Sequence, residues 1–432
     1  MIKKLDINIF IAFVLSFSIF GLLFPYKIPI YSPLVGVLFI YTIIKQKKIV
    51  FFTKNLIVLY ILELIYFISV FKTGVLYYHV EKDIINIITV NMIIIVLVNN
   101  LKDIENFQKF YFYFKKIVFI GTIIIGFIAL YKYILLLNGY PYIDFFFSDG
   151  EYPWGMALVT DYNFFALGAI IAIIFSYALF KKTNDNTIKF SLVIFTSILI
   201  SIVFLSGSRR AFLVLTVLLC LFFIVKSIQN VNFLKNNIYF ALTSLISFMF
   251  IFLILQTNFT SIEGNYNKHE YEKLFERLDT LESSSSRNPR IIRWKFALTS
   301  FQKYTFEEKL FGTDFNYLTE YGEKFSNNKV EGYPHNNILT HLLYSGIVGV
   351  IFLMVFYYQT VKYYLKYYKY LKRWFLVFII TTMFVLTSGN TTFSLKLYLL
   401  EMILPFIFDY IYQRTNSLKR ESNERDSINS IK

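Results

Sequence analysis

The sequence predicts an all-α integral membrane protein that crosses the bilayer about twelve times. Of the 432 residues, 56% are hydrophobic and only 16% are charged, whereas a soluble domain carries about 25% charged residues. The apolar residues also fall into blocks, and a block of roughly 20 helical residues spans a hydrocarbon core about 30 Å thick. One long polar stretch, 257–334, interrupts these blocks.

The apolar blocks divide the chain into four parts. The predicted spans are 7–24, 28–44, 50–71, 84–98, 117–137, 156–180, 190–206, 211–225, 238–256, 335–357, 374–389 and 395–412. Residues 1–256 therefore hold the first nine spans and 335–412 hold the last three. Residues 257–334 form a large outer loop that contains short helices, and the polar tail 413–432 is predicted to be disordered in the cytoplasm.

The distribution of Lys and Arg predicts the orientation. These residues gather in alternate short loops, which places both chain ends in the cytoplasm. The adjacent pair Arg209-Arg210 is the exception, because it falls in a short outer loop. The net charge of +15 does not indicate a nucleic-acid partner, since a nucleic-acid-binding protein concentrates its basic residues on one soluble face.

The exception at Arg209-Arg210 is the first candidate for chemistry. The segment Ser206-Gly207-Ser208-Arg209-Arg210 separates two apolar blocks and permits a tight turn at the outer surface. A guanidinium group bonds two phosphate oxygens at once, so this segment suits a phosphate or pyrophosphate. The alternative is that the two arginines bind lipid headgroups or end the helix.

A second cluster of arginines surrounds a predicted helix start in the long loop. Arg287, Arg290 and Arg293 flank Pro289, and proline favours the first position of a helix. A helix N-terminus attracts anions, and arginines strengthen that attraction. The alternative is the solvated face of an amphipathic helix. Its apolar face would contain Ile291, Trp294, Leu298 and Phe301.

The third candidate is His335, within Tyr333-Pro334-His335-Asn336-Asn337 at the end of the long loop. An imidazole that titrates near neutral pH can act as a general base at a position where water and a membrane-bound donor both reach it. The alternative is a histidine that caps the helix or lies at the membrane interface.

Asp161 and Asn163 are the fourth candidate, because they are predicted about two turns inside the span 156–180. Ionisable groups at such depth are costly and often functional. The alternative is that they form hydrogen bonds between helices. No metal site is expected, because the four histidines show no ligand spacing with acidic partners.

Taken together, these segments resemble the O-antigen ligase and O-antigen polymerase family of bacterial envelope glycosyltransferases. The resemblance rests on the order, spacing and placement of short motifs over about 155–355. The motifs are Asp161-Tyr162-Asn163-Phe164-Phe165-Ala166, Ser206-Gly207-Ser208-Arg209-Arg210-Ala211, Arg290-Ile291-Ile292-Arg293-Trp294, Leu310-Phe311-Gly312 and His335-Asn336 followed by Leu339 and Gly346-Ile347-Val348-Gly349.

The resemblance implies a metal-independent, inverting glycan transfer at the outer face of the bacterial inner membrane, without a cofactor. The implied donor is a glycan on undecaprenyl pyrophosphate, and the acceptor is a sugar hydroxyl. Arg209 and Arg290 would hold the pyrophosphate, with Arg210 competing for the first role and Arg287 and Arg293 for the second. His335 would accept the proton of the attacking hydroxyl or hold that hydroxyl in line, and Asp161, Asn163 and Asn336 would support the site.

Three functions remain open. A polymerase, which joins lipid-linked repeat units, is favoured because the membrane part is rich in aromatic residues and the motifs are loosely kept. A ligase, which moves finished glycan to lipid A-core or another acceptor, shares the donor chemistry. A flippase or transporter would need polar groups near the midplane, whereas the candidates here gather at the outer ends of the spans.

Overall fold

The computed structural model describes residues 6–24, 30–137, 156–159, 161–218, 246–247, 249, 289–325 and 332–430. These residues form helices joined by short connections, and they include no strand. Seven of their helices are long and apolar enough to cross a membrane. The all-α membrane fold is therefore confirmed. The count of about twelve spans stays a prediction, because 238–256 lies almost wholly outside the described residues and 211–225 lies partly outside them.

The chain folds into two compact units. Unit 1 comprises Met1–Val14, Ile30–Tyr111 and Ser285–Lys432, and unit 2 comprises Leu15–Pro29 and Phe112–Ser284. The boundary between the units runs through α1 (Ile7–Leu23) and α5 (Ile104–Leu137).

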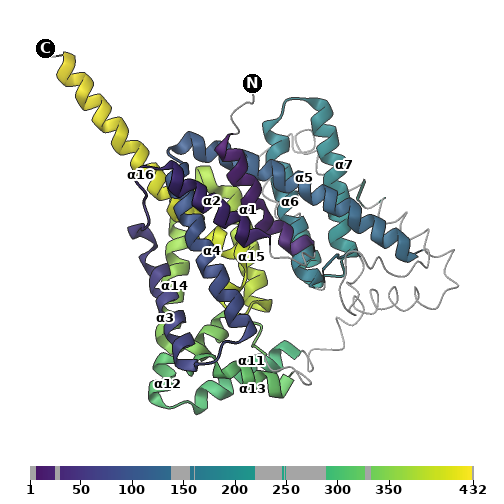
Figure 1. The fold of residues 1–432 in the computed structure, drawn as a ribbon. Coiled ribbons are helices and arrows are strands. Elements are labelled where there is room, and N and C mark those ends of the chain that lie inside the picture. The colour runs from purple at the N-terminus through teal and green to yellow at the C-terminus, as the bar shows by residue number, and fades with distance from the viewer. Residues whose placement is uncertain are drawn as a thin grey trace. The chain divides into compact units, whose positions relative to one another are not determined.

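Helix α14 (Asn337–Lys366) is the central helix of unit 1. It packs against α3 (Ile57–Thr73), α11 (Pro289–Lys303), α12 (Phe306–Phe311), α15 (Tyr368–Ser388) and α16 (Lys396–Ser430). The remaining elements of this unit are α2 (Tyr31–Lys45), η1 (Lys54–Leu56), α4 (Tyr78–Asn100), η2 (Asp314–Asn316), α13 (Tyr317–Phe325) and η3 (Thr392–Ser394). The short helices α11, α12 and α13 gather at the end of α3, α4 and α14 that lies away from the C-terminal end of α16 (Figure 1).

Unit 2 is built around α6 (Tyr162–Lys182) and α7 (Asn186–Leu205), which pack along each other. The hydroxyls of Ser176 and Thr196 form a buried hydrogen bond of 2.5 Å between these two helices. The second part of α5 belongs to the same unit, where Phe114 packs edge-on against Phe175 of α6. Apolar packing and this polar pair thus align α6 and α7.

Several helix boundaries differ from the predicted spans because polar residues enter the helices. Helix α4 begins at Tyr78 rather than near 84, and α5 begins at Ile104 rather than near 117. The tail 413–432, which is predicted to be disordered, instead continues α16 as far as Ser430. Its Lys, Arg and Glu residues are good helix formers, and neither glycine nor proline follows Pro405.

Buried carboxylates inside the helices form hydrogen bonds between neighbouring helices. Asn91 of α4 donates to both oxygens of Glu63 of α3, at 3.0 and 3.1 Å. Thr381 of α15 donates to Glu401 of α16 at 3.1 Å. These contacts favour a packing role for both carboxylates.

Candidate functional site

A backbone contact joins two of the motifs in unit 1. Gly312 has φ +81° and Gly346 has φ +64°, values that favour glycine. A Cβ at Gly312 would lie 2.3 Å from the carbonyl carbon of Tyr344, and a Cβ at Gly346 would lie 2.4 Å from the carbonyl oxygen of Leu310. The Thr313 amide also donates to the Leu343 carbonyl at 2.9 Å. The loop before α13 is therefore fastened to α14 where Gly346 interrupts that helix.

His335 lies two residues before the start of α14, at a position that the following residues fix. The Asn336 side chain caps the helix by accepting the Leu339 amide at 3.0 Å. His335 itself has φ +59°, in the left-handed region that costs a non-glycine residue about 1–2 kcal/mol. Its Nδ1 lies 3.4 Å from the Ser388 carbonyl oxygen. Since a carbonyl oxygen only accepts, this contact favours the tautomer that carries the proton on Nδ1.

Tyr333 connects His335 with the arginines of α11. The rings of Tyr333 and His335 are 4.4 Å apart between centroids. Arg293 donates to the Tyr333 carbonyl at 3.0 Å and to the Phe325 carbonyl at 3.5 Å. Burial lowers the pKa of the Arg293 guanidinium, and Tyr333 and Tyr321 oppose that effect. The structure thus brings one predicted arginine next to the predicted base, through contacts with the protein itself.

Arg290 lies one turn before Arg293 in the first turn of α11 and is half-buried. Ile291, Ile292 and Leu298 of the same helix are exposed, and Ala297 is buried. The predicted apolar face is therefore only partly covered within the described residues. Arg287, the third arginine of this cluster, lies outside the described residues.

The connection between α15 and α16 supplies polar partners that the sequence did not reveal. The Thr392 hydroxyl bonds His341 Nε2 at 2.9 Å and accepts from Asn337 at 3.0 Å. Tyr317 donates to Asn390 at 3.3 Å. Residues 388–394 thus hold the start of α14 and the residue before it. Their only sequence signal is a run of small polar residues between two apolar blocks.

Helix α4 adds two ionisable side chains, one against Tyr333 and one against the segment 388–394. The His79 ring packs edge-on against Tyr333, with 5.1 Å between centroids. Asp83, one turn further along, is buried and accepts hydrogen bonds from Tyr66, at 3.2 Å, and from Thr391. The spacing of His79 and Asp83 by one helical turn was a signal for one shared face. Because the span was predicted to begin at 84, both residues fell outside it and this signal was missed.

In unit 2, the structure joins the motif at Asp161 to the motif at Arg209. The Ser208 hydroxyl donates to the Asn163 side chain at 3.0 Å and accepts the Ala211 amide at 3.2 Å. Ser208 therefore caps the helix that runs over 209–218, after a turn in which Gly207 has φ +73°. Arg209 and Arg210 are the first two residues of that helix and are half-buried. Two cations at a helix N-terminus form a strong anion-binding arrangement.

The depth predicted for Asp161 is wrong. Helix α6 begins at Tyr162, and the exposed Asp161 side chain caps it by accepting the amides of Asn163 and Phe164 at 3.1 and 3.3 Å. An aspartate at the N-cap sets the start of the helix, so the helix does not extend back to 156. By setting the start of α6, Asp161 positions Asn163 for its hydrogen bond with Ser208.

Lys132 of α5 is a further polar residue of unit 2 that the sequence analysis missed. Its side chain is 2% exposed, and its ammonium donates to the Ala157 carbonyl at 2.7 Å. The adjacent Met156 amide donates to the Leu205 carbonyl at 3.0 Å, one residue before the motif at 206–211. A lysine inside an apolar helix was the available signal.

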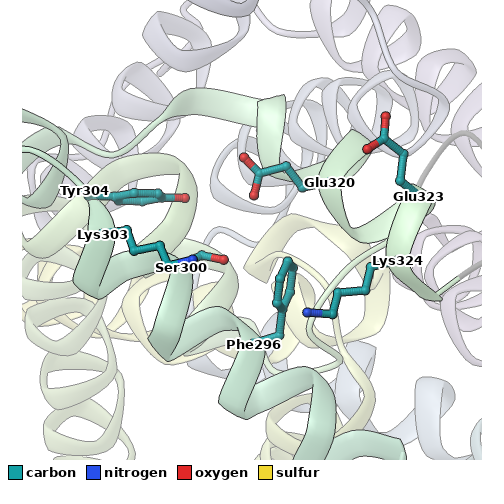
Figure 2. A pocket seen from close by; sticks show the side chains of 7 residues that line it. All are labelled: Phe296, Ser300, Lys303, Tyr304, Glu320, Glu323 and Lys324. Atoms are coloured by element: carbon teal, nitrogen blue, oxygen red, sulfur yellow. The ribbon is translucent and has the colours of Figure 1, made fainter.

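A groove of about 550 Å³ lies between α11 and α13 in unit 1. Its lining residues are Phe296, Ser300, Lys303, Tyr304, Glu320, Glu323 and Lys324 (Figure 2). Burial raises the pKa of Tyr304 to about 12, against the hydrogen bond from Thr313. The phenol is therefore neutral and keeps its proton at ordinary pH.

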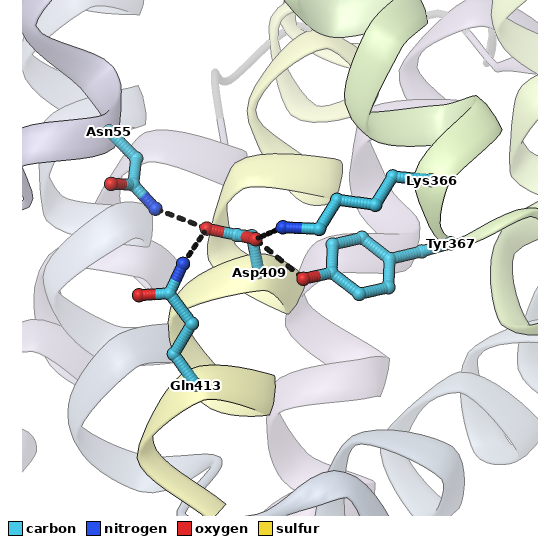
Figure 3. A network of polar contacts seen from close by, with 5 residues as sticks. All are labelled: Asn55, Lys366, Tyr367, Asp409 and Gln413. Carbon is cyan, nitrogen blue, oxygen red and sulfur yellow. Dashed lines mark hydrogen bonds and ion pairs between the residues drawn. The ribbon is translucent and has the colours of Figure 1, made fainter. Parts of the chain in front are cut away.

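A different polar cluster surrounds Asp409, at the other end of α14. Asp409 accepts hydrogen bonds from Asn55, Lys366, Tyr367 and Gln413 at 2.5–2.8 Å (Figure 3). Each carboxylate oxygen thus accepts from two donors, and the side chain is fully buried. A carboxylate with its acceptor sites filled in this way holds helices together rather than binding a substrate.

The fold and the polar helix ends together define a polytopic helical membrane protein with arginine-rich and histidine-containing sites. The family model described as O-antigen ligase matches residues 192–354. This match confirms the resemblance to the O-antigen ligase and polymerase family and indicates a membrane glycosyltransferase-like enzyme. No curated protein matches the chain. Among the described residues, no group of three His, Cys, Asp or Glu side chains could hold a metal ion.

Proposed function

We propose that this protein is a polysaccharide polymerase that transfers glycan from undecaprenyl pyrophosphate to a sugar hydroxyl of another lipid-linked repeat unit. The observation that carries the proposal is the cluster of Arg293, Tyr333 and His335 at one end of α14, in a chain that matches the O-antigen ligase model. It combines a base with a cation at the end of apolar helices, where a lipid-linked substrate meets water. The site faces the outside of the inner membrane and acts without a metal or cofactor.

His335 accepts the proton from the attacking hydroxyl in this proposal. The hydroxyl oxygen bonds to the anomeric carbon from the face opposite the leaving group, so the configuration inverts. The bond from that carbon to the pyrophosphate oxygen breaks, and its electron pair leaves with the pyrophosphate. The contact with the Ser388 carbonyl supports this role, because it favours a proton on Nδ1, and Nε2 is then the proton acceptor.

The arginines stabilise the leaving pyrophosphate. Arg209 and Arg210 begin a helix whose N-terminus adds its own positive potential. Arg290 lies in the first turn of α11 and has the same kind of setting. Fixed cations stabilise charge as it develops on the leaving group. That the arginines of both units act on one substrate stays a prediction from the sequence.

The remaining predicted residues have supporting roles. Asn336 caps α14 and thereby fixes the position of His335. Asp161 caps α6 and Asn163 accepts from Ser208, which orders the turn before Arg209. Arg293, bound to two backbone carbonyls, positions Tyr333 beside the base.

The surface glycan of a strain lacking this protein tests the proposal. Loss of a polymerase leaves one repeat unit attached to the acceptor. Loss of a ligase leaves none attached, with long polymer on the lipid carrier, and this pattern would replace the polymerase with the ligase. Unchanged glycan would contradict both transferases.

Substitution of the arginines separates their roles in the same strain. Arg209→Ala and Arg290→Ala should abolish polymer formation at normal protein abundance, whereas Arg287→Ala should be milder. Retained polymer in both of the first two variants would reject the proposed pyrophosphate site. Loss of transfer on adding a chelator to the purified protein would show that the metal-free mechanism is wrong.

A further inference from the structure

The groove between α11 and α13 is formed by one face of each helix. Ser300, Lys303 and Tyr304 lie four, seven and eight residues beyond Phe296, and Glu323 and Lys324 lie three and four residues beyond Glu320. The Phe296 ring packs edge-on against Tyr321, with 4.9 Å between centroids. The Lys324 ammonium lies 3.9 Å from the Phe296 ring centroid. The Phe296 ring thus gives the groove an aromatic surface with polar groups around it.

The polar side chains around the Phe296 ring do not form bonds with one another. Within the described part of the chain, neither Glu320 nor Glu323 forms an ion pair or a side-chain hydrogen bond, although two lysines line the same groove. Tyr304 accepts a hydrogen bond from Thr313 at 2.9 Å, and no described residue accepts a hydrogen bond from the Tyr304 hydroxyl. In Figure 2 the hydroxyls of Tyr304 and Ser300 and the Glu320 carboxylate surround an open space.

Such a groove has the chemistry of a site for hydroxyl-rich ligands. Carboxylates accept hydrogen bonds from hydroxyl groups, and the tyrosine hydroxyl and lysine ammonium groups donate to hydroxyl oxygens. The aromatic ring offers an apolar surface of the kind common in binding sites. Two carboxylates and two ammonium groups leave the lining without a net formal charge, which favours a neutral polar ligand over a phosphate.

We propose that this groove binds sugar residues of the glycan chain and selects the repeat unit. The inference rests on the proposed function, because it names the part of the same substrate that lies away from the reacting bond. Ser300 is ten residues beyond Arg290 on α11, a separation of about 15 Å along a helix. Ser300 and the neighbouring Tyr304 are thus placed to contact sugars that lie away from the reacting bond. The role of the groove is to hold the chain in register.

Binding of free oligosaccharide tests the proposal. The full-length protein in nanodiscs is titrated with repeat-unit oligosaccharide released by mild acid from the lipid carrier, and the heat of binding is measured. The double variant Glu320→Gln and Glu323→Gln should bind about tenfold more weakly or worse, since each change replaces an ionised acceptor. Both glutamates are exposed, so the fold should be retained. Ser300→Trp, which fills the groove, should also abolish binding.

Two controls separate this proposal from the proposed function. Glu307→Gln, an exposed residue of α12 that does not line the groove, should bind normally. His335→Asn should bind the oligosaccharide normally and lose transfer. Undiminished binding by the groove variants, or no binding by the unaltered protein, overturns the groove proposal. Retained transfer by His335→Asn overturns the role of His335 and leaves the groove in place.

Discussion

His335 combines a left-handed backbone with an imidazole beside Tyr333 and Ser388. Asparagine enters the left-handed region more readily than alanine does, so His335→Asn removes the base at a lower backbone cost. We expect His335→Asn to abolish transfer while its abundance and melting temperature match those of the unaltered protein. In vitro transfer from purified lipid-linked donor measures the first, and thermal unfolding in detergent measures the second. Transfer above about one hundredth of normal would contradict the proposed base.

Arg293 allows a second test at the same scale. The guanidinium bonds two carbonyls at once, whereas the single ammonium of Arg293→Lys cannot reproduce that planar fork. We expect the variant to transfer about tenfold more slowly, with an altered pH profile because Tyr333 moves beside His335. An unchanged pH profile at reduced abundance would show that Arg293 acts only on stability.

At this scale the sequence indicates candidate residues but does not show what surrounds them. His335, Arg209 and Arg290 stand out because their charge or titration conflicts with their place next to apolar spans. His79, Asp83 and Lys132 were missed. Local hydropathy treats a charge near a span end as a topology signal and does not show whether a distant segment, such as 388–394, satisfies it.

Among the elements, the break of α14 at Gly346 is the most demanding local feature. An added Cβ would meet the backbone of Leu310 and Phe311, which has no rotamer through which to yield. We expect Gly346→Ala to lower the free energy of unfolding by about 3 kcal/mol or more. Gly36→Ala is the matched control, because nothing lies within 4 Å of its added methyl. It should be neutral or slightly stabilising in the same thermal melt, and equal losses in both variants would contradict this interpretation.

The cluster at Asp409 joins η1, α14 and α16 at the opposite end of α14. Asp409→Asn replaces one acceptor oxygen by a donor that would face two donors. We expect a loss of about 2 kcal/mol in unfolding free energy. Glu105→Gln, which breaks an exposed ion pair with Lys109, should change it much less, because solvent screens the pair. A smaller effect at Asp409 than at Glu105 would reject the cluster as a stabilising contact.

Helices were therefore predicted well as elements and less well in their limits. Apolar blocks located α3, α6, α7, α14 and α15 to within several residues. Their limits depend on individual capping contacts, such as that of Asp161, and on polar residues such as Asp83 that tertiary contacts bury. Hydropathy averaged over a window does not detect either effect.

For the whole molecule, the predicted orientation has a direct test. If the C-terminus is cytoplasmic, α11–α13 face the outside, since they lie at the end of unit 1 away from the end of α16 (Figure 1). We expect Glu323→Cys in a Cys220→Ser background to react with an impermeant maleimide in intact cells. Lys369→Cys, an exposed residue just beyond the other end of α14, should react only after the cells are opened. The reverse pattern would invert the topology.

The membrane class of the whole molecule could be predicted from composition alone, whereas its division into two units could not. The division runs through α1 and α5, and an apolar helix shows no change of composition where its neighbours change. The family motifs are likewise spread over both units, so the sequence predicts which residues matter and leaves their assembly to long-range packing.

The glycine contact between 310–313 and 343–346 also has a consequence for engineering. Because this contact joins backbone atoms, side chains that face away from it can be exchanged without disturbing it. If the groove selects the repeat unit as proposed, grafting groove residues such as Ser300 and Glu320 onto a relative that keeps both glycines should transfer the sugar preference of this protein. Surface polysaccharides of altered composition would be the product of that exchange.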